Sequence, residues 1–188
     1  MKASVRHTSS LFLIWQVAEF EARQLKASNI EPIHLLLGLS KTVDLDLIAL
    51  VPKDVANRNE VLEECLREVR RLRNVFRSAN LNAAIFRRRI RRASGEQRFS
   101  FEQSECLHRS PSARKLFADA EHLAQLAGGV VYPVHLLYTV LTTKDPCRDE
   151  VLKELGIDKK RLREAVRQEL LFEHGIPITP KDDKAKWN

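Results

Sequence analysis

The chain has 188 residues, of which 44% are hydrophobic, 6% aromatic and 30% charged, and its formal net charge is +7. This is a composition able to build a globular core, and its abundant Leu, Ala, Arg and Glu favour helix over strand. No stretch approaches the roughly 18 apolar residues of a membrane-spanning helix, and the apolar run at 11–15 is too short for a signal core. We therefore expect a helical, cytoplasmic protein with no membrane partner.

The three cysteines exclude two further classes of protein. Cys65, Cys106 and Cys147 are odd in number, lie far apart and show no Cys-x-x-Cys spacing. This pattern argues against a disulfide framework and against a zinc site, and it fits a reducing cytosol.

The N-terminal segment has the pattern of a helix with one buried face. Thr8 is a good N-cap residue, because its hydroxyl can accept a hydrogen bond from a free backbone N–H. Apolar residues then recur three and four positions apart; these are Leu11, Ile14, Ala18 and Ala22. The alanines are expected to let another helix approach closely. A second helix is predicted in the apolar stretch 30–39, where Pro32 fits the first turn.

The same two segments return about a hundred residues later in the chain. The stretch 131–140 matches 30–39 at a constant offset of 101 residues, and Ser110 matches Thr8 at an offset of 102. The apolar face of the first helix also recurs, at Ala113, Leu116, Ala120 and Ala124. The sequence therefore contains two copies of one helical unit.

Each unit continues into two shorter helices. The segment 75–90 matches 151–166 at an offset of 76, with Asn80 opposite Gly156 and Asn82 opposite Asp158. Asn and Gly tolerate the left-handed backbone that ends a helix, and Asn or Asp caps the next one. Because this offset is smaller than 101, the first copy carries about 25 extra residues. This insertion is predicted to add a helix whose apolar stripe consists of Val61, Leu62, Cys65, Leu66, Val69, Leu72 and Phe76.

These matches predict how the chain is organised. Residues 1–93 form the first repeat, with the helical insertion at about 41–72, and residues 110–174 form the second repeat. Residues 94–109 are expected to be a linker and residues 175–188 a mobile C-terminal tail. The predicted fold is an all-α, pseudo-twofold, double-repeat bundle of about eight core helices plus one inserted helix.

The repeated residues resemble a known family. A Ser/Thr cap, alanines four apart, an Ile/Val-x-Pro-Ile/Val-His-Leu-Leu helix and a closing Leu-Gly-Ile-Asp turn are similar to the Clp N-terminal repeat domain, which leads the Clp/Hsp100 unfoldases. The resemblance is clearest from Ser110 to about Gln168. It implies a pseudo-twofold bundle of eight helices that recruits substrates or adaptors.

Two features separate this sequence from full-length members of that family. No glycine precedes a lysine, so the chain lacks the Gly-Lys-Ser/Thr of a phosphate-binding loop, and it resembles free-standing members such as plastid accessory subunits. In many bacterial relatives a glutamate precedes the repeated histidine, and in one branch it helps to bind phosphorylated arginine. Ile33 and Val134 stand at these positions, and an apolar side chain cannot pair with a guanidinium. We expect no phosphoarginine recognition by that route.

The sequence offers no convincing catalytic or metal-binding constellation. His34 and His135 each lie in an apolar helix, where a packed and hydrogen-bonded structural histidine is the usual case. Glu121 and His122 are adjacent rather than spaced for a shared metal, and Cys106 lies near His108 only in the linker. We therefore expect no enzymatic activity and no cofactor.

Basic charge is concentrated in one part of the chain. Between Arg58 and Arg98 there are twelve arginines, five glutamates and no lysine, so this segment alone carries a net charge equal to that of the whole chain. Around the apolar positions 86 and 90, helical spacing predicts an outward face of four arginines; these are Arg87, Arg88, Arg91 and Arg92. Such a face can be a solvated surface, a site for an acidic protein, or a phosphate-binding surface.

Two further residues are candidates for contact with a partner. Glu31 and Tyr132 are expected to occupy equivalent, exposed positions in the turns before the His-Leu-Leu helices. An exposed tyrosine can anchor a partner or simply pack on its own turn. We therefore predict a non-catalytic module whose partner is a Clp-type ATPase, a protease subunit, an adaptor or an unfolded substrate. The alternative is a nucleic-acid-associated regulator that binds through the arginine face.

Overall fold

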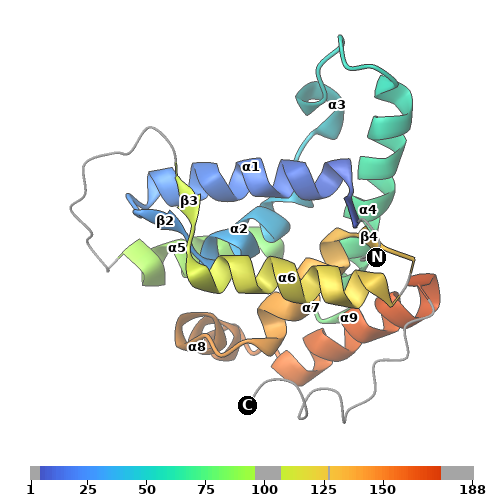
Figure 1. Cartoon of the computed structure of the whole chain (residues 1–188). Helices are drawn as coiled ribbons and strands as arrows, with labels where there is room; N and C mark the ends of the chain where they lie inside the picture. Colours follow the sequence, from blue (N-terminus) through green and yellow to red (C-terminus); the bar gives the residue numbers. More distant parts are fainter. Residues whose placement is uncertain (1–4, 96–106, 127, 175–188) are drawn as a thin grey trace.

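The computed structural model describes residues 5–95, 107–126 and 128–174. These residues form nine helices and four two-residue strands, which confirms the predicted all-α fold class (Figure 1). In chain order the elements are β1 (Arg6–His7), α1 (Ser9–Gln24), β2 (Asn29–Ile30), α2 (Pro32–Thr42), α3 (Leu47–Leu50), α4 (Arg58–Ser78), α5 (Ala83–Gly95), β3 (His108–Arg109), α6 (Pro111–Gln125), β4 (Val130–Val131), α7 (Pro133–Thr142), α8 (Pro146–Glu154) and α9 (Lys159–His174). Most of the predicted linker and all of the predicted tail at 175–188 lie outside the described residues.

The nine helices follow the repeat found in the sequence. Helices α1, α2, α4 and α5 belong to the first copy, and α6, α7, α8 and α9 are their counterparts in the second. Helix α3 has no counterpart. Asn80 and Gly156 both have positive φ angles, of 55° and 66°, and end matching helices as predicted.

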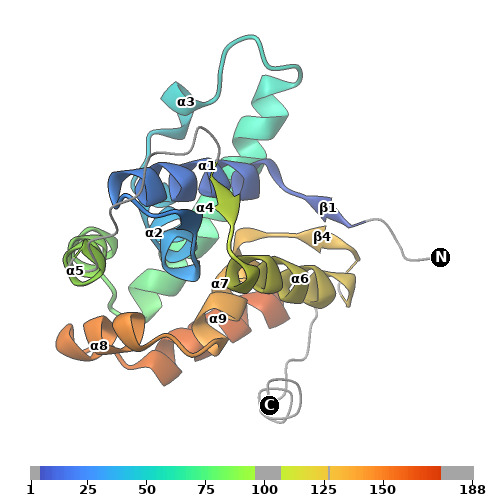
Figure 2. The ribbon, with the colours of Figure 1, turned by 60° about the vertical axis from the view of Figure 1, so that its left-hand side comes forward.

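Two short parallel strand pairings join the repeats. Strand β1 pairs with β4 (Figure 2), and strand β2 pairs with β3 (Figure 1). The first strand of each repeat therefore pairs with the second strand of the other. Because each pair takes one strand from each copy, neither repeat can complete its own hydrogen bonds in this part of the backbone.

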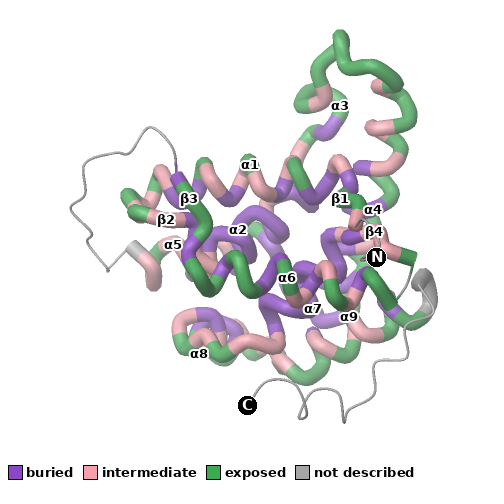
Figure 3. Tube along the Cα trace, in the orientation of Figure 1, coloured by how far each residue is buried: buried purple, intermediate pink, exposed green. Residues whose placement is uncertain are grey.

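The helices also pack across the repeat boundary. Helix α4 of the first copy contacts α9 of the second, and α5 contacts α8 in the reciprocal way. The central helices α2 and α7 are the most buried elements, as Figure 3 shows, and they contact each other. One continuous hydrophobic core contains buried residues of both repeats.

The helix N-termini agree with the sequence except at one residue. The hydroxyl of Ser110 accepts from the backbone N–H of Ala113 at 3.1 Å, and the side chain of Asn82 accepts from that of Ile85 at 3.0 Å. Thr8 occupies the predicted cap position, but its hydroxyl lies 3.0 Å from the hydroxyl of Ser10 and makes no cap bond. The hydrogen bonding of this side chain within its own turn could not be read from residue type alone.

The helix predicted in the insertion is not a separate one, because it continues into the first repeat. The predicted apolar stripe does form one helix, but that helix is α4, which runs without a break into the repeat and is the counterpart of the shorter α8. The additional helix is α3, a single turn capped by Asp46, whose side chain accepts from the backbone of Ile48 and Ala49. Figure 1 shows α3 and the start of α4 projecting from the bundle.

Helices α1 and α2 pack closely because small residues meet between them. Ala18 and Ala22 are fully buried on α1. A Cβ atom added to Gly38 would lie 2.6 Å from the carbonyl oxygen of Ile14 and 3.3 Å from the Cβ of Ala18. Only glycine therefore fits this position without moving one of the helices.

Replacing Gly38 by alanine tests this packing, because the change in the free energy of unfolding should have the opposite sign from that in an open helix. In an open helix Gly→Ala is stabilising by up to about 1 kcal/mol through helix propensity. For Gly38→Ala we expect the opposite, a loss of about 1–3 kcal/mol, because the methyl group overpacks the α1–α2 contact. Urea unfolding monitored by circular dichroism measures this, and a gain in stability would show that α1 yields without cost.

Candidate functional site

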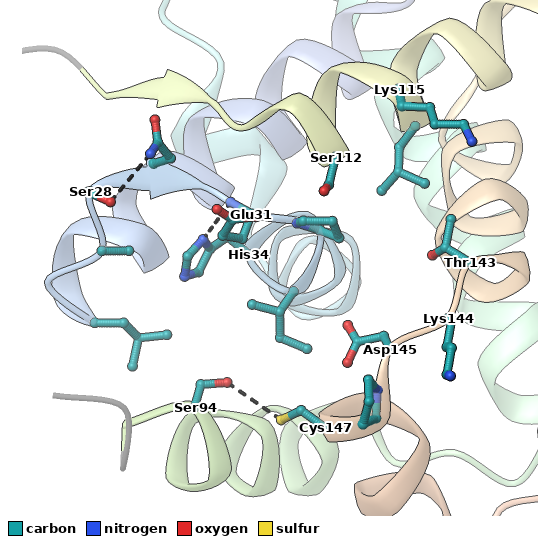
Figure 4. A pocket seen from close by; sticks show the side chains of 17 residues that line it. Ser28, Glu31, His34, Ser94, Ser112, Lys115, Thr143, Lys144, Asp145 and Cys147 are labelled. Carbon is teal, nitrogen blue, oxygen red and sulfur yellow. Dashed lines mark hydrogen bonds between the residues drawn. The ribbon is translucent and has the colours of Figure 1, made fainter. Parts of the chain in front are cut away.

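A pocket of about 730 Å³ opens where β2 and β3 join the two repeats, a region that we call the β2–β3 junction. Four segments line it: residues 25–34 around the start of α2, Ser94 near the end of α5, residues 112–116 at the start of α6, and residues 143–147 between α7 and α8. Figure 4 shows these side chains around one hollow. The pocket is therefore built from both repeats and depends on their pairing.

The lining combines apolar surface with a charged rim. The apolar lining residues are Leu25, Ala27, Pro32, Ile33, Leu116 and Pro146. Lys115 and Lys144 are exposed at the rim. Of the two lining carboxylates, Asp145 accepts from the backbone N–H of Arg148 at 3.0 Å and so caps α8. A site whose lining is partly apolar and partly polar suits a segment that buries apolar side chains and is oriented by polar contacts.

His34 lies against the pocket and has a structural role. Its Nδ1 atom accepts a hydrogen bond from the backbone N–H of Glu31 at 2.9 Å, and His135 makes the same bond to Tyr132 at 3.0 Å. Each histidine thus takes the place of the Glu or Gln of a capping box. Burial lowers the pKa of His34 to about 4, against an opposing effect of the Glu21 carboxylate. The imidazole is neutral at physiological pH and fixes the first turn of α2.

The other reactive group in the pocket is not activated. The sulfur of Cys147 lies 3.9 Å from the hydroxyl of Ser94, and burial raises the pKa of this thiol above its usual value. A thiol with a raised pKa stays protonated and is a poor nucleophile. Within residues 5–95, 107–126 and 128–174, no group of three His, Cys, Asp or Glu is placed to hold a metal ion. No helix in the same ranges is long and apolar enough to cross a membrane.

The structure separates the two predicted contact residues, Glu31 and Tyr132. Glu31 lines the pocket at the β2–β3 junction, as the sequence placed it in an accessible turn. Tyr132 is half-buried, as Glu31 is, but it is covered by other side chains: the guanidinium of Arg71 lies 5.9 Å from its ring centre, and the His135 ring lies 5.7 Å away. Equivalent positions in the sequence therefore have different surroundings.

Comparison with solved structures identifies the fold. The N-terminal domain of Hsp104 from Candida albicans aligns with a TM-score of 0.60 and 17% identity over 86% of this chain and 89% of that one. The N-terminal domain of the caseinolytic protease associated chaperone ClpD from Arabidopsis thaliana gives 0.51 and 20% over 90% and 99%. The fold is that of the Clp N-terminal domain.

Other comparisons complete this picture. A structure from a malarial protein secretion system aligns with a TM-score of 0.62 and 17% identity over 89% of this chain and 97% of that one. No family model matches the sequence, and no curated protein matches it. The resemblance drawn from the repeated residues is therefore confirmed at the level of the fold.

Within this Clp N-terminal fold, the four predicted arginines do not form one outward face. Arg91 donates two hydrogen bonds to the buried Glu21 carboxylate, at 2.6 and 2.7 Å, and the pKa of Glu21 is lowered in spite of its burial because Arg91 and Lys41 stabilise the charged form. Arg87 pairs with Asp44 at 2.7 Å and donates to the backbone carbonyl of Ser40.

Only two of the four arginines point outward. Arg88 and Arg92 are exposed, whereas Arg87 and Arg91 lie on the side of α5 that faces α1 and α2. Helical spacing correctly indicated the buried positions 86 and 90, but it could not reveal that acceptors on α1 and after α2 neutralise two neighbouring cations.

Sequence reasoning also missed residues of the pocket. Ser112, Lys115 and Lys144 were not singled out, because none belongs to a recognisable motif. A signal was nevertheless present in the repeat, since Lys115 aligns with Leu13 and Lys144 with Val43. A charged residue opposite an apolar one at matched positions indicates that the two junctions have different environments.

The lowered pKa of His34 predicts how stability depends on pH. Between pH 6.5 and about 4 the unfolded chain binds a proton at this residue that the folded chain does not, so stability falls as the pH is lowered through this window. The expected loss from this residue is roughly 2 kcal/mol between pH 7 and pH 5. In His34→Gln, which keeps a capping side chain, this part of the pH dependence should vanish in urea titrations at the two pH values. The exposed His108→Gln serves as control, and an equal change in both variants would contradict the assignment.

Proposed function

We propose that this chain is a non-catalytic protein-binding module that recruits a substrate, an adaptor or a Clp-type ATPase or protease partner. The observation that carries this proposal is the pocket at the β2–β3 junction, which has apolar as well as polar residues in its walls, is bordered by lysines and is built between the two repeats. The Clp N-terminal fold supports the same function, because the ClpD domain that shares it belongs to a caseinolytic protease associated chaperone.

The pocket suits an apolar segment of a protein that also carries carboxylates. Burial of apolar side chains against Ile33, Leu116 and Pro146 would supply most of the affinity. Lys115 and Lys144 at the rim would favour acidic residues beside that segment and speed the encounter at low salt. A contact of this limited size is of the weak, transient class that recruitment requires.

The alternative, a nucleic-acid-associated regulator, receives less support. It relied on four adjacent arginines, and two of these, Arg87 and Arg91, are engaged by carboxylates of the same chain. Arg88 and Arg92 remain and, with the exposed Arg89, form a small basic surface of the kind that solvated helices commonly carry. We place the module in the cytoplasm, in keeping with the free cysteines Cys65 and Cys147.

Filling the pocket tests the proposal. Ser112 is exposed at the pocket wall, so Ser112→Trp should block the pocket without disturbing the core; Ala118→Trp, an exposed position of the same helix that does not line the pocket, is the matched control. The probes are a purified Clp-type ATPase, a Clp protease core and a permanently unfolded protein, reduced and alkylated α-lactalbumin. We expect at least one of these probes to bind the native chain and the Ala118→Trp control equally. The affinity of Ser112→Trp for that probe should be lower by a factor of about ten or more, as measured by interferometry.

Two results would contradict this proposal. Equal binding by both tryptophan variants would move the binding surface away from the β2–β3 junction. Loss of binding in the double variant Arg88→Gln/Arg92→Gln, together with binding of a DNA or RNA duplex that weakens steeply with salt, would favour the nucleic-acid function instead.

A further inference from the structure

The fold contains a second junction, around β1 and β4, that is equivalent in sequence to the open pocket but is closed. Three lining residues of the open pocket, Ile33, Ser112 and Lys144, are half-buried or exposed. Their counterparts at the β1–β4 junction are Val134, Ser10 and Val43, and all three are buried, with exposures of 0%, 0% and 3%. Equivalent residues are therefore present at both junctions, but at the β1–β4 junction another part of the chain covers them.

The cover is the first part of α4. We call residues 61–69 of this helix, which have no counterpart in the second repeat, the occupant segment. Its Glu64 carboxylate accepts from the backbone N–H of Ser9 at 3.0 Å, where α1 begins. In the continuation of the same helix, Arg71 lies over the ring of Tyr132, and Arg73 donates to the backbone carbonyl of Val43. Together these contacts of α4 lie at or beside the counterparts of three of the four segments that line the open pocket.

Apolar packing completes the contact. Cys65 and Val69 of the occupant segment are 2% and 3% exposed and form a small hydrophobic cluster with Leu47, against which Leu13 of α1 packs. Leu13 is the counterpart of Lys115, the exposed lysine at the rim of the open pocket. The first repeat thus has the apolar Leu13 in contact with the occupant segment, and the second repeat has Lys115 at the same position, where the pocket is open to solvent.

Nothing equivalent to the occupant segment follows α7. Helix α7 ends at Thr142 and α8 begins at Pro146, whereas α2 ends at Thr42 and α4 begins only at Arg58. The match at an offset of 76 aligns Pro146 with Arg70, so residues 45–69 are additional to the symmetric fold. Without residues 45–69, Asp44 would be followed directly by Arg70, which matches the connection of Asp145 to Pro146 in the second repeat.

We propose that the occupant segment is an internal ligand: an amphipathic helix that fills the pocket of the β1–β4 junction and leaves one open pocket per chain. This inference rests on the proposed function in that it treats the open junction as a binding pocket. It also identifies the chemistry that the β1–β4 junction binds, a helix with apolar residues one turn apart and a carboxylate directed at the N-terminus of α1.

The direct test supplies the segment in trans. Deleting residues 45–69 should leave a folded, symmetric domain with two open pockets, which circular dichroism and cooperative thermal unfolding would verify. The probe is a synthetic peptide of residues 57–69 with Cys65→Ser, linked covalently between the exposed positions 63 and 67 to hold it helical. We expect the peptide to bind the deletion variant saturably with 1:1 stoichiometry by calorimetry. Its affinity for the native chain, whose junction is already filled, should be lower by a factor of about ten or more.

Two matched variants of the deletion protein distinguish this inference from the function proposed for the open pocket. Leu13→Lys, which makes the β1–β4 junction resemble the open one, should weaken peptide binding about tenfold or more. Ser112→Trp, which blocks only the open pocket, should leave peptide binding unchanged. A folded deletion protein that binds no peptide, or that loses binding with Ser112→Trp, would overturn the internal-ligand assignment while leaving the proposed function intact.

A second measurement uses the native chain and does not require the deletion to fold. In a Cys106→Ser/Cys147→Ser background, Cys65 is the single thiol, and it lies on the buried face of the occupant segment. We expect Leu13→Lys to speed labelling of Cys65 by about tenfold or more beyond the rate that its global stability predicts, because the segment detaches locally. The exposed Ile48→Lys is the control. Labelling that always follows global unfolding would show that the segment belongs to the core, and would refute the proposal.

Discussion

The fold depends on the exchange of short strands between its two repeats. Beyond the ladder bonds, the backbone N–H of Thr8 donates to the carbonyl of Val131, and that of Ser110 donates to the carbonyl of Ile30. These bonds fix the first turns of α1 and α6 beside the first turns of α7 and α2. Each junction therefore brings together a helix start from one repeat and a helix start from the other, which is the geometry that the open pocket requires.

On this symmetric frame the chain has built an asymmetric molecule. The open junction keeps lysines at its rim, and the closed junction has leucine and valine at the same positions, where they contact a helix. The closed junction also contains Glu68, which is fully buried beside Arg71 at 2.9 Å; burial raises the pKa of this carboxyl group although the arginines oppose the shift. Both arginine partners lie on α4 itself, and Arg71 also lies 3.8 Å from Glu169 of α9, so this group links α4 to the second repeat.

The sequence predicted the fold well because the information was local and repeated. Capping residues, apolar spacing and the left-handed positions at Asn80 and Gly156 specify helices and turns whatever their neighbours are, and finding them twice indicated the bundle. The candidate site was predicted far less completely. Glu31 does line the pocket, but its equivalent Tyr132 lies under Arg71, and no local pattern shows which helix covers which turn.

The arginines show the same limit of sequence reasoning. The period of a helix tells which side of α5 is buried, yet the carboxylates that meet Arg87 and Arg91 come from residues 43 and 70 positions away in the chain. Such pairings follow from tertiary structure, and single-sequence patterns do not contain them. The cap bonds of His34 and His135 were easier to anticipate, since donor and acceptor are three residues apart.

The exchanged strands have a consequence for how the chain is made. Strand β1 lies near the N-terminus, but its partner β4 is about 120 residues further on, and β2 must wait for β3 in the same way. During synthesis the first repeat leaves the ribosome with two unpaired strands and half of a core. It can acquire its native structure only after the second repeat has followed, so the nascent first half exposes apolar surface for several seconds at typical rates of translation. Chaperones that bind this apolar surface would protect the nascent chain until the second repeat has been made.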